Sequence, residues 1–464
     1  MVSELAPLSL TQILRRRPQW VLAAILAMTS IGIVLQPGFG RLNYYFALST
    51  ALVVPLLVGF AVIQAVGQLG RAAASSPPLW ALFRVSGALT AVYLTIPLLA
   101  AGLAAIWVRN CAPFRGVLFY LFETGLGTLV ASVVALGVAL LPIRWRSALF
   151  LAIWLASLLA TTSDLYFEPR IFLYNHFVGF FSGAIYDEVI VITATFVWFR
   201  LVSLALVFVV ASLVILAFDP TSGTLSRRAF RQRRAVGKLA WCGLAVVVCT
   251  AQLAGGYIGF SRGRRDVQRE LSHHRTSEHF VFHVADALDA ERWKQLVDDF
   301  EFRYDRLSRF FAVDLDRRVH VYIYAGAAQK RRLMGAARTF VAKPWLFEVH
   351  LNRVKFGDAI VTHELAHVFA AAFGSGPFRI AARYGVLVHM GLVECVAVAA
   401  EWDDGDYTPH QLVAAMRTLA RRNELSRLPA LASIMGTFGF WKQHAGTAYT
   451  IAGSFVRFLV ERYG

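Results

Sequence analysis

The sequence predicts a polytopic α-helical membrane domain followed by an α+β domain. Three observations lead to this fold class. The 464-residue chain is 57% hydrophobic and only 16% charged, with a mean hydropathy of 0.55, unlike a soluble protein. Apolar runs long enough to cross a bilayer as helices fill the first 260 residues. Beyond residue 276 the apolar runs are shorter and alternate with charged residues, as in a domain folded in water.

Seven apolar runs fit membrane-crossing helices. They lie near residues 20–35, 43–66, 85–108, 117–141, 147–167, 195–218 and 239–260. Three arginines precede the first run and no small-residue cleavage site follows it, so we interpret it as a retained anchor. Residues 171–185 are too short for a comfortable span and contain Asn175 and His176. We expect residues 168–192 to form a re-entrant or interfacial segment; a crossing there would give eight spans.

The charge pattern predicts how the chain crosses the membrane. Residues 1–260 hold 18 Lys and Arg against 7 Asp and Glu, which is most of the net charge of +17. These arginines gather in alternate loops, above all at residues 227–238. The positive-inside rule therefore places the N-terminus in the cytoplasm and the C-terminal domain outside it, across the inner membrane in a bacterium. Because the basic excess serves topology, we expect the lipid bilayer as a partner and no nucleic acid.

Acidic residues in the membrane half suggest a second polar site. Glu123 lies inside an apolar run, and Asp187 and Glu188 fall near the same predicted outer face. Acids buried in membranes tend to be paired and functional, and Arg109, Arg115 or Arg170 could pair with them. The alternative is solvated loop acids with one interhelical hydrogen bond from Glu123.

The most specific pattern is His363-Glu364-Leu365-Ala366-His367. On a helix, histidines four residues apart share one face, where both imidazoles can bind a single zinc ion. Glu364 then projects beside the metal, where its carboxylate can accept a proton from water. Apolar residues flank the pattern, so we predict a buried helix; an ordinary helix with two surface histidines is the alternative.

A second apolar segment, residues 390–401, offers a third metal ligand. Glu394 has apolar neighbours on both sides, so we expect it to point inward, where a carboxylate needs a metal or a cation. Two histidines and one carboxylate leave the fourth zinc position open, as in catalytic sites. Glu401, followed by Trp402 and an acidic run, is expected to mark the end of the helix in solvent.

These motifs resemble those of the gluzincin type of zinc metallopeptidase, the MA-like domains in which HExxH is followed by a helix of the pattern (W/L)LxEGxA. Here the second motif reads Leu392-Val393-Glu394-Cys395-Val396-Ala397, with Cys395 in place of the usual glycine. Residues 448–459 are similar to the Y-x-x-x-G-S-F-V helix near the end of such domains. The resemblance covers residues 277–464 and implies a zincin-like fold, Glu394 as third ligand and Tyr449 as a donor to the oxyanion. A tyrosine that only packs on a core helix is the alternative.

Shorter elements are expected before the histidine motif. Alternating residues predict strands at 278–284, 318–324 and 345–351, and helical periodicity predicts helices at 289–311 and 327–334. By the same resemblance, the strand at 345–351 would be the edge strand that holds an extended peptide.

The sequence thus predicts three parts: a multi-span transmembrane domain (1–260), a basic juxtamembrane linker (261–276) and a zincin-like metallopeptidase domain (277–464) with Zn²⁺ as cofactor. The expected activity is hydrolysis of peptide bonds in a peptide or protein substrate, with Glu364 as general base. Two alternatives stay open. The domain could be a zinc hydrolase or amidase of cell-envelope substrates, or a non-catalytic membrane sensor or scaffold.

Overall fold

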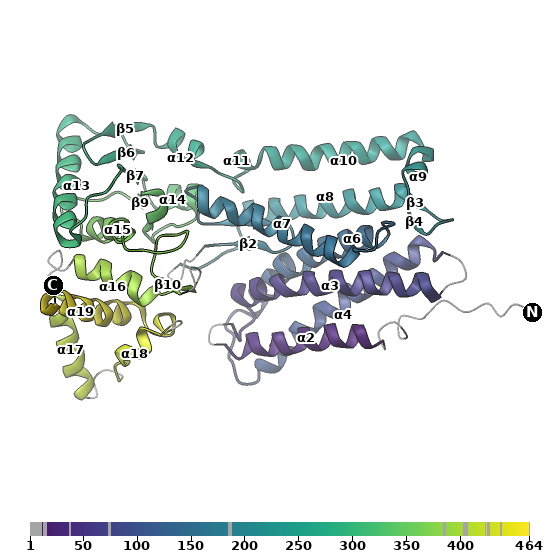
Figure 1. The fold of residues 1–464 in the computed structure, drawn as a ribbon, viewed down its shortest axis with the longest axis horizontal. Coiled ribbons are helices and arrows are strands. Elements are labelled where there is room, and N and C mark those ends of the chain that lie inside the picture. Colours follow the sequence, from purple (N-terminus) through teal and green to yellow (C-terminus); the bar gives the residue numbers. More distant parts are fainter. Residues whose placement is uncertain are drawn as a thin grey trace, which may run out of the picture. The chain divides into compact units, whose positions relative to one another are not determined.

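The computed structural model describes residues 12, 16–36, 39–72, 76–183, 188–383, 387–401, 407–422, 424, 427–436 and 439–463. The chain divides into two compact units. Unit 1 comprises residues 1–165, 172–183 and 189–262, and unit 2 comprises residues 166–171, 184–188 and 263–464. Figure 1 labels their helices and strands.

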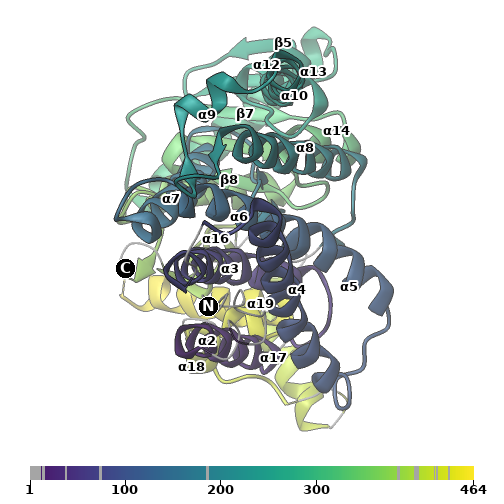
Figure 2. The same cartoon turned by 90° about the vertical axis from the view of Figure 1, so that its right-hand side faces the viewer.

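Unit 1 is built on seven helices that are long and apolar enough to cross a membrane (Figure 1). They are α2 (Arg17–Val34), α3 (Tyr44–Ala72), α4 (Leu79–Ala104), the continuous run of α5 (Pro113–Tyr120), η1 (Leu121–Gly125) and α6 (Leu126–Ala139), then α7 (Arg146–Phe167), α8 (Ala194–Ala217) and α10 (Ala235–Leu253). Helices α2 and α3 lie side by side and are seen nearly end-on in Figure 2. Seven such helices indicate an integral membrane protein, as the sequence predicts.

A short hairpin takes the place of an eighth span. Strands β1 (Leu173–Asn175) and β2 (Gly179–Phe181) pair antiparallel, with Asn175 opposite Gly179. The Asn175 side chain accepts hydrogen bonds from the backbone N–H groups of Phe177 (2.8 Å) and Val178 (3.1 Å), which closes the turn. The expectation that residues 168–192 do not cross as a helix is confirmed for the described part, 168–183 and 188–192.

Unit 2 contains a five-stranded sheet in the order β5-β6-β7-β9-β8. Strands β6 (Phe280–Val284), β7 (Val319–Ile323) and β9 (Glu348–Leu351) are parallel, while β5 (His273–Thr276) and β8 (Val341–Lys343) are antiparallel edge strands. Two expectations need correction. Residues 264–276, expected to be part of a linker, instead form helix α12 (Arg264–Glu270) and strand β5. The side chains of Val267 and Leu271 are buried, and β5 pairs with β6, so this segment belongs to the folded unit. The strand predicted at residues 345–351, implied by the resemblance to be an edge strand, is found as β9 inside the sheet, because β8 pairs along its outer side.

The core of unit 2 lies on one face of this sheet. Every second residue of the three parallel strands is a buried Phe, Val, Ile or Leu, and these side chains pack against α13 (Ala290–Phe311) and α15 (Ala359–Ala370). Figure 1 shows both helices beside the sheet. The period of two in the strands and the amphipathic pattern of α13 both predict this arrangement. It fixes α15, which carries the histidine motif, on the sheet.

The last part of unit 2 is helical. Helix α16 (Met390–Ala400) lies between α15 and α19 (Ala445–Tyr463), and packs on both. A Cβ at Gly453 of α19 would lie only 2.2 Å from Val398 Cγ1 of α16, so a glycine is required for this close approach. The remaining elements are α9 (Arg227–Gln232), α11 (Gly255–Ile258), α14 (Ala327–Met334), η2 (Pro344–Leu346), α17 (Pro409–Arg421), α18 (Leu431–Ile434), η3 (Phe440–Lys442) and the strand pairs β3–β4 (Phe218–Asp219, Thr224–Leu225) and β10–β11 (Ala382–Arg383, Leu387–Val388).

Candidate metal centre

Helix α15 begins at a side-chain cap and buries its histidine motif. The carboxylate of Asp358 accepts a hydrogen bond from the backbone N–H of Ile360 (3.3 Å), which satisfies one free donor of the first turn. Leu365 and Phe369 are fully buried against the sheet. His363 and Glu364 are also buried, so the polar groups of the motif must find partners inside the protein.

Those partners come from α16. His363 Nε2 lies 3.3 Å and His367 Nε2 lies 3.6 Å from the same oxygen, Oε2 of Glu394. The three side chains form a group whose ligand atoms all lie within 4.8 Å of one another. Two imidazole nitrogens and one carboxylate oxygen at these separations can hold a metal ion. Glu394 is buried, as expected of a residue that points inward, and the structure places it against both histidines.

The state of Glu394 follows from its surroundings. Burial alone would raise the pKa of this carboxyl, but the interactions with His363 and His367 hold the pKa well below its usual range. Glu394 is therefore ionised, as a carboxylate ligand must be.

Glu401 also belongs to this centre, although the sequence led us to place it in solvent at the end of the helix. Its Oε1 lies 3.3 Å from Nδ1 of His363, and its side chain is 24% exposed. Residues 394 and 401 are two turns apart, so both lie on the face of α16 that meets α15. In the sequence, the acidic residues after Glu401 indicate a helix end in solvent, and nothing in the local pattern indicates its contact with His363. A carboxylate on Nδ1 keeps the proton there and leaves Nε2 as the metal-binding nitrogen.

Glu364 and Tyr449 complete the surroundings. Burial raises the pKa of Glu364, while the two histidines oppose that rise. The ring of Tyr449, from α19, lies 6.2 Å from the ring of His363, centroid to centroid. The close packing of α16 and α19 at Gly453 brings this tyrosine to the centre. Cys395 is buried among Ile434, Ala448 and Ala452.

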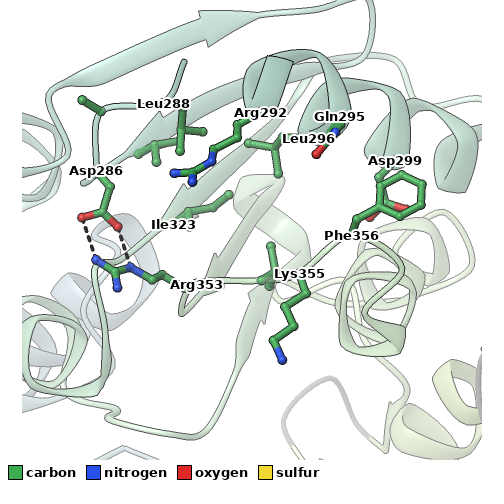
Figure 3. A pocket seen from close by; sticks show the side chains of 13 residues that line it. Asp286, Leu288, Arg292, Gln295, Leu296, Asp299, Ile323, Arg353, Lys355 and Phe356 are labelled. Atoms are coloured by element: carbon green, nitrogen blue, oxygen red, sulfur yellow. Dashed lines mark hydrogen bonds and ion pairs between the residues drawn. The ribbon is translucent and has the colours of Figure 1, made fainter. Parts of the chain in front are cut away.

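A cavity of about 570 Å³ opens at the carboxyl ends of β6, β7 and β9 (Figure 3). Leu288, Leu296 and Ile323 give it an apolar floor, and Asp286 and Arg353 form an ion pair with contacts of 2.7 and 3.0 Å at its edge. No residue of the histidine and glutamate group lines this cavity. Chemistry at the metal centre would therefore take place outside it.

Of the three acids predicted to form a membrane polar site, the two that the structure describes, Glu123 and Glu188, have separate surroundings. Glu123 is buried in the π-helical turn η1 of unit 1, and its Oε2 accepts from the backbone N–H of Phe180 in the hairpin (2.7 Å). Arg200 of α8 donates to the carbonyls of Phe122 (2.6 Å) and Glu123 (2.7 Å). The arginine beside Glu123 thus comes from a spanning helix, and not from the loop arginines that the sequence suggested.

Glu188 belongs to unit 2. Its Oε1 accepts from the backbone N–H groups of Ala337 (2.7 Å), Arg338 (2.6 Å) and Thr339 (3.1 Å), and its Oε2 lies 3.0 Å from Arg331. Burial would raise the pKa of Glu188, but these hydrogen bonds lower that pKa to about 2. Glu188 therefore anchors a loop and shares no hydrogen-bond partner with Glu123. Asp187 lies outside the described residues.

Comparison with known proteins adds no relative: no family model, no curated protein and no solved structure matches this chain.

Proposed function

We propose that this chain is a membrane-anchored zinc-dependent metallopeptidase with its centre at His363, His367 and Glu394. The observation that carries the proposal is the convergence of Nε2 of both histidines on Oε2 of Glu394, inside a buried site. The order HExxH followed by a glutamate on the next helix supports the gluzincin type among the zinc peptidases, by resemblance.

The donor set fits zinc. Zinc prefers imidazole nitrogen and carboxylate oxygen, and three protein ligands are the usual number at catalytic sites. Glu401 on Nδ1 of His363 is the supporting carboxylate that such histidines commonly have. A zinc ion in this position would supply Lewis-acid activation of the scissile carbonyl and of the attacking water.

The neighbouring residues have distinct roles in this proposal. Glu364 accepts the proton of the attacking water and returns it to the leaving amine, for which a buried carboxyl with a raised pKa is suited. Tyr449 donates a hydrogen bond to the oxyanion. Strand β8, which pairs only with β9 among the described strands and packs against α15, offers an edge for an extended peptide. We further propose that unit 2 lies on the extracytoplasmic side.

The test is zinc content and peptide-library cleavage of the full-length protein, wild type and Glu364→Gln. We expect about one zinc per chain in both, and a loss of cleavage by roughly 10²- to 10⁴-fold in the variant, because the amide cannot accept the proton. Glu278→Gln, a change of the same kind at an exposed glutamate, is the matched control and should keep full activity.

The other outcomes separate the alternatives. Absence of zinc from the wild type would contradict the metal centre itself. Zinc without cleavage of any peptide would contradict the peptidase, and hydrolysis of cell-envelope amides would then identify the amidase instead.

A further inference from the structure

Two adjoining cavities lie at one end of unit 1, where α3 ends, α7 begins and the β3–β4 hairpin turns. Their volumes are about 510 and 480 Å³, and both are lined by Gly67, Arg71 and Arg146. The cavities lie at the end of the helical bundle where the arginine-rich loops are found. By the positive-inside rule this is the cytoplasmic face.

The lining of these cavities is strongly basic. Arg71, Arg144 and Arg146 line them, and none of the lining residues is acidic. Within the described part of the chain, none of the three arginines forms an ion pair with a carboxylate. Arg146 is held by a hydrogen bond from its Nε to the carbonyl of Leu141 (3.1 Å), which leaves its terminal nitrogens for another partner. Three guanidinium groups without a counter-charge favour an anion, and phosphate fits them by bidentate hydrogen bonds.

The first cavity is also lined by two glutamines whose side-chain oxygens lack a hydrogen-bond donor in the described structure. The side-chain oxygens of Gln64 and Gln68 are buried and accept no hydrogen bond in the described structure. Gln68 is only 5% exposed, so an acceptor there without a donor is costly. A ligand with a phosphate and a hydroxyl or ammonium group would satisfy both the arginines and the glutamines.

The rim of the cavity is apolar. Trp145 is 78% exposed and Ile143 38% exposed, directly beside Arg144 and Arg146 in the loop between α6 and α7. A tryptophan next to arginines at the end of a spanning helix is typical of the lipid headgroup region. Basic pockets between helices on the cytoplasmic side are known places for anionic headgroups.

We propose that these cavities bind the phosphodiester headgroup of an anionic phospholipid that carries a free hydroxyl, of the phosphoglycerol type. The phosphate lies between Arg71 and Arg146, and the headgroup hydroxyl donates to Gln68. This site is independent of the metal centre, and its proposal does not depend on the proposed activity.

The test is native mass spectrometry of the full-length protein released from detergent, with phosphatidylglycerol or phosphatidylcholine added at equal concentration. We expect the wild type to retain phosphatidylglycerol at least tenfold more tightly than phosphatidylcholine, which has neither net charge nor donor. Arg71→Gln with Arg146→Gln should abolish this preference, whereas Arg71→Lys with Arg146→Lys should keep most of it. Arg84→Gln removes an exposed arginine outside the cavities and is the matched control.

Two further arms identify the ligand. Gln68→Leu should reduce the preference for phosphatidylglycerol over phosphatidic acid, which lacks the hydroxyl. Competition by free glycerol 3-phosphate at micromolar concentration would support the same chemistry with a soluble source. If phosphatidylglycerol binds no better than phosphatidylcholine, or if the Arg71/Arg146 glutamine variant and the Arg84 variant retain it equally, the proposal is wrong.

Discussion

At the scale of single residues, Glu401 would support the proposed metal centre without being one of its direct ligands. His363 can present Nε2 to a metal only if its other nitrogen carries the proton, and Glu401 stands 3.3 Å from that nitrogen. We predict that Glu401→Gln weakens zinc binding by about 10- to 100-fold while the protein stays folded. The measurement is competition with a chelator of known affinity.

Glu461→Gln provides the control for this prediction, because Glu461 lies at the exposed end of α19 and pairs with Arg457. Glu394→Gln should lose far more affinity than Glu401→Gln, since it removes a ligand. Wild-type affinity in Glu401→Gln would show that His363 keeps its orientation without this carboxylate.

At the scale of elements, the sequence predicts regular helices and strands well but not their neighbours. The amphipathic pattern of residues 289–311 and the helical run of residues 327–334 are found as α13 and α14. The residue pattern predicts a strand at 345–351 and the resemblance implies that it is an edge strand, yet the three-residue β8 lies outside it in the sheet. Strand order and the approach of Glu401 to His363 depend on tertiary packing, which local periodicity does not encode.

The contact between α13 and α15 depends on a buried ion pair. Arg303 Nε lies 3.1 Å from Oδ1 of Asp299, and both side chains are less than 10% exposed. The guanidinium of Arg303 also donates a hydrogen bond to the hydroxyl of Thr362 in α15. We predict that Asp299→Ala lowers the free energy of unfolding by about 3 to 5 kcal/mol, because Arg303 loses its buried ion pair with Asp299. Chemical denaturation of the detergent-solubilised protein measures this.

A second change tests the cause. Asp299→Ala combined with Arg303→Met removes both charges and should recover much of the loss. Asp316→Ala removes one partner of the exposed Asp316–Arg317 pair and should have no measurable effect. Equal losses in the single and double variants would mean that packing, and not the lost ion pair, explains the effect.

At the scale of the whole molecule, acid sensitivity should arise in unit 2, on the sheet face opposite the core. His283 lies there between His274 (3.0 Å) and His320 (3.1 Å), beside Tyr322 and near Glu348 and His350. Burial, with the neighbouring histidines, lowers the pKa of His283 to about 4, and burial also lowers the pKa of His320 and of His350. This face is therefore built for neutral histidines.

Its pH dependence has a definite sign. Between pH 6.5 and about 4 the unfolded chain protonates position 283 and the folded chain does not, so acid favours unfolding. We predict that the wild type loses stability as pH falls through this window, with a contribution from His283 of at most about 1.4 kcal/mol per pH unit. His283→Gln, which cannot take up the proton, should make the unfolding free energy fall less steeply over the same window, whereas His444→Gln at an exposed position should not change the slope. The slopes come from denaturant unfolding at a series of pH values. Identical slopes for wild type and His283→Gln would show that folding does not lower the pKa of His283.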